Sequence, residues 1–222
     1  MKCFNNIHGC STKCSDPWPH YEVNNFFTSE YIDKLYSVME QLEYTGYGEK
    51  NRYEFKYSHT HYKKYDLVKD FIDQFRSHDG IGILKQISPI DLNGKLLRIS
   101  LLKDTPGYTI GVHTDATYKL FTGMVYLPVV KNKSMGTRFY DEHKREIKAR
   151  PYVKNTGFFF FSKPWASPCV PLGSQSAQWH GFNKPFNDLR MSFMINIFDA
   201  GKFLHKMREK NIASPHCEVF TI

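Results

Sequence analysis

The sequence has few cysteines and lacks long apolar runs. Its five cysteines among 222 residues are an odd number, which argues against a disulfide framework and favours a reducing compartment. The opening segment MKCFNNIHGCSTKC has no apolar signal core. No apolar run reaches the length that a transmembrane helix needs. These absences predict a cytoplasmic protein that does not cross a membrane.

The sequence also lacks a concentrated basic patch. The formal net charge is +8 and the pI is about 9.1, which would help to attract an anionic partner. However, the basic residues are dispersed, and the densest run, HKREIKAR, also contains an acid. Nucleic acid therefore stays an alternative partner that the sequence does not favour.

The N-terminal cysteines raise the question of a small metal-binding knot made by Cys3, His8, Cys10 and Cys14. Their spacing differs from that of zinc fingers, which pair closely spaced ligands at both ends. We therefore expect residues 1–16 to form a flexible tail.

The abundant residues are aromatic: they make up 16% of the chain, with fourteen Tyr and eighteen Phe, and they favour a β-rich interior. Apolar spacing predicts helices over 28–42, capped by Thr28 or Ser29, and over 66–77, and a short helix over 200–211. The runs that read as strands are KLLRISLL, LFTGMVYLPVV, GTRFYD, TGFFFFS, AQWHGF and RMSFMINIF. Residues 46–65 form a polar, Tyr-rich stretch between the helices.

This order predicts a mainly β protein with flanking helices. We expect one domain over 17–222, in which a helical part (17–80) packs on a jelly-roll core (81–200).

One polar pattern on the predicted strands suggests a metal site. In YTIGVHTD, His113 and Asp115 are two residues apart, so a strand would place both on one face. His180, in WHGF, could add a third ligand from a distant strand. Two His and one carboxylate leave metal positions open and are typical of non-haem Fe(II) oxygenases. Because the chain has ten His, the tripeptide alone could also be a chance match.

A cation follows the third histidine at a distance that fits a hairpin. Arg190 lies ten residues after His180, and Ser192 shares its face of the strand. A guanidinium binds a carboxylate through two parallel hydrogen bonds, and a hydroxyl can add another. These residues could hold the far carboxylate of a dicarboxylate.

Taken together, the chain resembles the 2-oxoglutarate- and Fe(II)-dependent oxygenases, in their prolyl-hydroxylase-like branch. The resemblance spans about Pro17 to Phe198, through PWPHYEVNNFFTSEYID, TPGYTIGVHTD, YLP, GTRFY, NTGFFFFS, WHGF and RMSF. It implies a double-stranded β-helix (jelly-roll) dioxygenase core.

The resemblance also implies residue roles. His113, Asp115 and His180 would bind Fe(II), and Arg190 with Ser192 would bind the distal carboxylate of 2-oxoglutarate. Where animal-type prolyl hydroxylases place a cosubstrate-binding Tyr, this chain has Asp104. Tyr126 and Tyr108 are the candidates for that role, against the alternative that each is only structural.

The implied reaction consumes 2-oxoglutarate and O₂ and yields succinate, CO₂ and a hydroxylated product, with ascorbate as an optional reductant. The primary substrate stays open between a peptidyl prolyl group, an amino acid and a small metabolite such as a sugar, and so does the oligomeric state. One alternative is a nucleic-acid oxidative demethylase, which would need a second Arg at the position of Asn196. The other is a non-catalytic cupin-like binding protein.

Several further residues have two interpretations. Lys119, four after Asp115, could orient a carboxylate or be a solvated residue at a strand end, and we expect the latter. Arg98 could be a pocket cation or an edge residue. Trp165, Gln175 and Gln178, near the expected pocket mouth, could contact substrate or only pack a loop.

Overall fold

The computed structural model describes residues 1–47, 49–130, 132–162, 178–182, 184–209 and 219–222. The helical elements are α1 Ile7–Cys10, α2 Ser29–Met39, α3 His59–Lys64, α4 Asp66–Arg76, a π-helical turn His78–Gly82, α5 Ile83–Ile87, a 3-10 turn Lys133–Met135 and α6 Ala200–Glu209. The strands are β1 Ser11–Cys14, β2 His20–Asn24, β3 Thr45–Gly46, β4 Arg52–Lys56, β5 Leu96–Asp104, β6 Gly111–His113, β7 Lys119–Tyr126, β8 Arg138–Tyr140, β9 Glu146–Ala149, β10 Thr156–Phe161, β11 Trp179–Phe182, β12 Arg190–Phe198 and β13 Phe220–Thr221.

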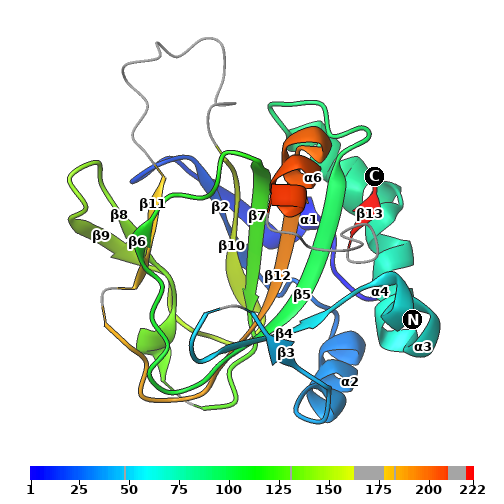
Figure 1. Ribbon diagram of the computed structural model, residues 1–222, viewed down its shortest axis with the longest axis horizontal. Coiled ribbons are helices and arrows are strands. Elements are labelled where there is room, and N and C mark those ends of the chain that lie inside the picture. The colour runs from blue at the N-terminus through cyan, green and yellow to red at the C-terminus, as the bar shows by residue number, and fades with distance from the viewer. Residues whose placement is uncertain (48, 131, 163–177, 183, 210–218) are drawn as a thin grey trace.

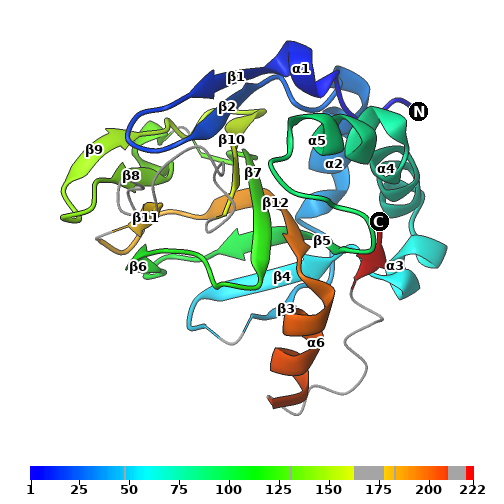
Figure 2. The same cartoon turned by 90° about the horizontal axis from the view of Figure 1, so that it is seen from above.

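Two antiparallel sheets form the body of the molecule. The larger has nine strands in the order β1-β2-β10-β7-β12-β5-β4-β3, with β13 added against β5, and the smaller has the order β6-β11-β8-β9. Figure 1 shows the small sheet on one side of the large sheet and helices α2 to α4 on the other, and the turned view in Figure 2 agrees. This arrangement confirms the predicted jelly-roll core with flanking helices.

The central strand β12 separates two interiors. It pairs with β5 along its whole length, from Arg190 opposite Asp104 to Phe198 opposite Leu96. Its apolar positions, such as Phe193 and Ile195, belong to the core beneath the helices. The alternate positions, beginning with Arg190, face the other way because successive strand residues point to opposite faces. The polar side of β12 therefore faces the space between the sheets.

The two predicted helices provide the apolar cover of the large sheet. Thr28 caps α2, since its hydroxyl accepts a hydrogen bond from the Tyr31 backbone N–H at 3.3 Å. The buried stripe of α4 consists of Leu67, Val68, Phe71, Ile72 and Phe75. Phe71 contacts Phe193 of β12 with ring centroids 4.8 Å apart. Burial of these large side chains supplies most of the driving force for packing, at about 25 cal/mol per Å² of apolar surface.

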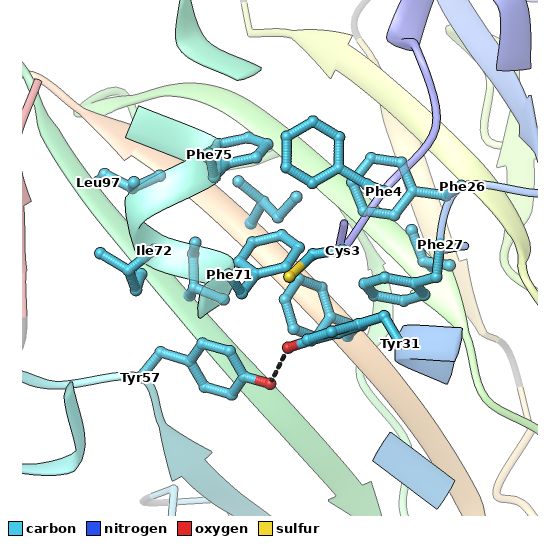
Figure 3. Packing of buried hydrophobic residues seen from close by; sticks show 14 of the residues in the cluster. Cys3, Phe4, Phe26, Phe27, Tyr31, Tyr57, Phe71, Ile72, Phe75 and Leu97 are labelled. Atoms are coloured by element: carbon cyan, nitrogen blue, oxygen red, sulfur yellow. Dashed lines mark hydrogen bonds between the residues drawn. The ribbon is translucent and has the colours of Figure 1, made fainter. Parts of the chain in front are cut away.

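The first fourteen residues correct the expectation of a flexible tail. Strand β1 pairs with β2, and Cys3, Phe4 and Ile7 are buried. Figure 3 shows Cys3 and Phe4 among the aromatic rings beneath the helices, beside the Tyr31–Tyr57 hydrogen bond of 2.9 Å. Since Cys3 and Cys10 are core residues, the suggested knot of Cys3, His8, Cys10 and Cys14 is not formed.

The polar stretch over 46–65 contains elements that sequence reasoning missed. Residues Arg52–Lys56 form β4, which pairs with β5, and His59–Lys64 form α3. Within β4, Arg52 and Glu54 are buried although both are charged. Charged side chains on the inner face obscured the strand pattern, because inward positions are normally apolar.

No helix in the described part of the chain is both long and apolar enough to span a lipid bilayer.

Candidate functional site

Two short strands of the small sheet bring two histidines into direct opposition. In the antiparallel pair β6–β11, His113 lies opposite His180, and their ring centroids are 4.6 Å apart. The strands come this close because Gly181 has no side chain: a Cβ there would lie 1.9 Å from the Gly111 carbonyl oxygen. Gly181 also has a φ of +142°, which favours glycine.

In both imidazoles, a backbone carbonyl fixes the Nδ1 nitrogen. His180 Nδ1 lies 2.9 Å from the Gln178 carbonyl oxygen, and His113 Nδ1 lies 3.2 Å from that of Gly111. A carbonyl only accepts hydrogen bonds, so each Nδ1 carries the proton and each Nε2 keeps a lone pair. Such backing of a histidine is characteristic of metal ligands.

The carboxylate comes from outside the strand, which corrects one premise of the sequence reasoning. Strand β6 ends at His113, so Asp115 lies in the loop that leads to β7. Its carboxylate accepts hydrogen bonds from Lys119 at 2.8 Å and from the Thr122 hydroxyl at 2.6 Å. These two β7 residues, and not strand alternation, orient Asp115.

The same contacts correct the expectation that Lys119 is solvated. Burial by itself would lower the pKa of Lys119, but the neighbouring Asp115 raises it. Conversely, burial would raise the pKa of Asp115, but Lys119, His180 and the Thr122 hydroxyl hold it well below its usual range. Burial lowers the pKa of His180 to about 4, although Asp115 opposes this shift. At neutral pH His180 is therefore an uncharged imidazole and Asp115 is a carboxylate, as metal ligation requires.

The three side chains converge on one point. His113, Asp115 and His180 each place a ligand atom within 4.8 Å of the others. Two imidazole nitrogens and one carboxylate on one side of an ion fit the donor set of non-haem Fe(II) oxygenases. They do not fit a structural zinc site, which is closed by four protein ligands. The residues thus provide an open metal site.

The cluster lies in a cavity of about 350 Å³ between the two sheets. Tyr47, Arg52, Met124 and Arg190 also line this cavity, so it extends from the histidines to two arginines. Its walls combine these charged and polar groups with apolar side chains such as Phe158, Phe182 and Met194.

At the arginine end, a buried carboxylate joins the two cations. Asp104 lies 2.6 Å from Arg52 Nε and 2.9 Å from Arg190 Nη1, and the side chains of Asp104 and Arg190 are fully buried. Arg190 also donates to the Met135 carbonyl at 3.0 Å and contacts Met124 Sδ at 3.1 Å. Arg190 therefore already has one anionic partner within the protein. The half-exposed Glu49 lies 3.9 Å from Arg52 Nη1, so this end has two cations and two carboxylates, of which only Asp104 is fully buried.

Sequence reasoning missed Thr122 and also Arg52. Burial would lower its pKa, but Asp104 raises it, so Arg52 stays charged. A signal was present in RYEFK, where charged residues alternate with Tyr53 and Phe55. That period-2 alternation predicts a strand with one charged face.

The other expected cosubstrate residues lie near Arg190 but outside the lining of the cavity. Ser192 is buried on the same face of β12, and its hydroxyl has no hydrogen-bond partner among the described residues. The Tyr126 hydroxyl accepts a hydrogen bond from the Thr137 backbone N–H at 2.9 Å. Tyr108 donates to Glu49 at 3.0 Å and lies under Arg52, with 4.1 Å from the guanidinium carbon to the ring centroid.

The remaining candidates have structural contacts or lie outside the description. Arg98 forms an ion pair with the buried Glu54 at 2.6 Å. Gln178 donates to the Phe161 carbonyl at 2.9 Å. The Asn196 side chain lies 3.2 Å from the Thr122 hydroxyl and occupies the position where a nucleic-acid demethylase would need an arginine. Trp165 and Gln175 fall outside the described residues.

Comparisons of sequence find no counterpart: no protein-family model and no curated protein matches the chain. Comparison of structures, in contrast, finds several similar proteins. A prolyl hydroxylase from Trichoplax adhaerens, in complex with a hypoxia inducible factor peptide fragment, matches with a TM-score of 0.58 at 10% identity, covering 84% of this chain and 86% of that one. A 2OG-Fe(II) oxygenase family oxidoreductase from Burkholderia pseudomallei matches with a TM-score of 0.54 at 9% identity, covering 81% and 85%.

A prolyl 4-hydroxylase from Phytophthora capsici matches with a TM-score of 0.55 at 12% identity. The match covers 82% of this chain but only 59% of the Phytophthora chain. At such low identity these likenesses establish the fold alone, and that fold is the one expected from the resemblance in the sequence.

Proposed function

We propose that the chain is an Fe(II)- and 2-oxoglutarate-dependent dioxygenase that hydroxylates a C–H bond of a primary substrate. The observation that carries this proposal is the convergence of His113, Asp115 and His180 in one cavity with the buried Arg190. One end of the cavity offers open metal ligands, and the other presents the guanidinium groups of Arg52 and Arg190. Such a cavity fits a bound metal together with a dicarboxylate cosubstrate.

Each residue has a defined task in this proposal. His113, Asp115 and His180 hold Fe(II), which supplies the position where O₂ is activated. Lys119 and Thr122 orient the Asp115 carboxylate. Arg190 binds the distal carboxylate of 2-oxoglutarate, and Arg52 adds positive charge next to it while Asp104 fixes both guanidinium groups.

The proposed substrate is a peptidyl prolyl group, an amino acid or a small metabolite. The Trichoplax neighbour was seen with a peptide, which makes peptides the first class to test. The position of Asn196 favours these classes over methylated nucleic acid.

Metal binding tests the site directly. The full chain, with its metal removed, is titrated anaerobically with Fe(II), and 2-oxoglutarate binding is then measured by calorimetry. We expect one Fe(II) in the cluster and 2-oxoglutarate binding that depends on it. His180→Ala should weaken Fe(II) binding by more than about 100-fold, beyond the usual loss on removing a second-layer partner. The exposed His143 provides the matched control, His143→Ala, which should bind as the parent does.

Turnover tests the reaction class. Succinate release is measured with Fe(II), O₂ and 2-oxoglutarate over peptides, amino acids, sugars and methylated oligonucleotides. Stimulation by one class, lost in His180→Ala and kept in His143→Ala, supports the proposal. Fe(II) binding that survives in both His113→Ala and His180→Ala would overturn it.

A further inference from the structure

A second group of ligand-type side chains lies on the outermost hairpin of the large sheet. Cys14 of β1 is directly opposite His20 of β2, and Glu22 lies two residues further along β2. Opposed residues and residues two apart share a face. The three side chains each place a ligand atom within 4.8 Å of the others. Neither the fold nor the proposed function requires this arrangement.

The buried histidine of this group has one nitrogen without a partner. His20 is 1% exposed, and its Nδ1 lies 2.8 Å from the Trp18 carbonyl oxygen, so Nδ1 carries the proton. Its Nε2 has no hydrogen-bond partner among the described residues. A buried acceptor left unpaired costs about 1–3 kcal/mol. His113 and His180 have the same backing by a carbonyl two residues earlier.

Glu22 is held as a carboxylate by two cations. It forms ion pairs with Lys148 and with Arg150, the latter at 3.0 Å. Burial would raise the pKa of Glu22, but these two partners lower it. A carboxylate has about four lone-pair positions, so it can accept from both cations and still ligate a metal. Hydrogen bonds from a second layer to a ligating carboxylate are the usual arrangement at metal sites.

The group of Cys14, His20 and Glu22, here called the hairpin group, is separate from the cluster of His113, Asp115 and His180. The indole of Trp18 contacts both: its centroid lies 5.2 Å from the His20 ring and 6.3 Å from the His180 ring. The two groups share no ligand. Only the hairpin group contains sulfur, which gives it a preference for softer metals than the cluster has.

We propose that Cys14, His20 and Glu22 bind Zn²⁺, with solvent as the fourth ligand, and that this ion fastens β1 to β2 at the edge of the large sheet. Thiolate, imidazole and carboxylate are all ligands of Zn²⁺. The proposal is independent of the proposed function, since it uses none of the cavity residues.

Cobalt(II) tests the site, because it replaces zinc and its bond to a thiolate absorbs in the near ultraviolet. The full chain is freed of metal under reducing conditions and titrated with Co²⁺. We expect a thiolate-to-cobalt band that saturates at one ion per chain and is displaced by Zn²⁺. Cys14→Ser should remove the band, and Cys10→Ala, a matched change at a buried cysteine outside the group, should keep it.

Two further variants distinguish loss of this site from misfolding and from metal binding in the cavity. His113→Ala should keep the band while cobalt binding in the cavity is lost, and Zn²⁺ should raise the melting temperature of this variant. Glu22→Gln, checked by circular dichroism, should weaken Co²⁺ binding without removing the thiol. A parent chain without the band, or a band that persists in Cys14→Ser, would overturn the proposal. A failure of Fe(II) to bind in the cavity would leave the band unchanged.

Discussion

A buried carboxylate lies at or directly behind each end of the cavity, but the groups around the two carboxylates differ. At the metal end, Asp115 is matched by one cation, Lys119, and by the Thr122 hydroxyl. At the arginine end, Asp104 is shared by two cations, Arg52 and Arg190. The metal end thus offers free lone pairs, whereas the arginine end presents two buried guanidinium groups that share one buried carboxylate.

This difference shows how one cavity can keep a metal and an anion apart. Lys119 stabilises the ionised form of Asp115, which is the form that can bind a metal. Asp104 holds Arg190 and Arg52 in place, because a buried cation without a partner is strongly destabilising. Each end therefore stays stable when empty, and it selects its ligand by the lone pairs or the guanidinium donors that it presents. Variants at one end should affect only the ligand of that end.

Among variants that keep all three metal ligands, the largest effect is expected at the arginine end. Arg190→Met removes a charged hydrogen-bond donor worth about 1.5–3 kcal/mol. The KM for 2-oxoglutarate should therefore rise by roughly 10–100-fold. Steady-state kinetics with varied 2-oxoglutarate checks this, and Arg52→Met should give a smaller rise, because Arg52 holds Asp104 with two of its nitrogens.

The separation of the two ends is tested in the same variants. Fe(II) affinity should be unchanged in Arg190→Met, and the exposed Arg145 provides the control Arg145→Met. Loss of Fe(II) binding together with 2-oxoglutarate binding would mean that the two ends do not act separately.

A smaller effect is expected at the metal end. Thr122→Val removes the hydroxyl that bonds to Asp115 at 2.6 Å and keeps the shape of the side chain. Loss of one second-layer partner should lower Fe(II) affinity by about 10-fold. Calorimetric titration of the metal measures it. Thr156→Val, at a hydroxyl bonded only to the Val153 carbonyl, is the matched control. An unchanged Fe(II) affinity in Thr122→Val would show that Lys119 alone orients Asp115.

Much of the fold could be predicted from the sequence because its signals were local. The nine residues of β12 and the stripe of α4 follow simple periods that match their surroundings. Strand β4 was missed because Arg52 and Glu54 face inward, which only partners on β5 make favourable. The N-terminal segment looked like a tail because its anchor, Phe4, contacts the rings of Phe71 and Phe75 on the distant helix α4.

In the site, too, local spacing could be predicted from the sequence and long-range partners could not. The spacing of His113, His180 and Arg190 was sufficient to group them, but the partners that set their chemistry come from other strands. Asp104 is 86 residues from Arg190 and 52 from Arg52 along the chain. Such pairings are fixed by sheet register, which depends on the whole fold.

The smallest effect concerns protons, and it too distinguishes the two ends. An unfolded histidine has a pKa near 6.5, whereas burial lowers the pKa of His180 to about 4. Between these values the unfolded chain binds a proton that the folded, metal-free chain does not, so stability falls as the pH falls from 6.5 toward 4. The contribution stays below about 1.4 kcal/mol for each pH unit.

His180→Asn should therefore reduce the slope of unfolding free energy against pH, measured by urea denaturation in EDTA. Arg190→Met should leave the slope unchanged, because a guanidinium stays charged throughout. The buried His20, whose pKa is also lowered by burial, should contribute with the same sign. Equal slopes in His180→Asn and the parent chain would mean that water reaches the His180 ring when the metal is absent.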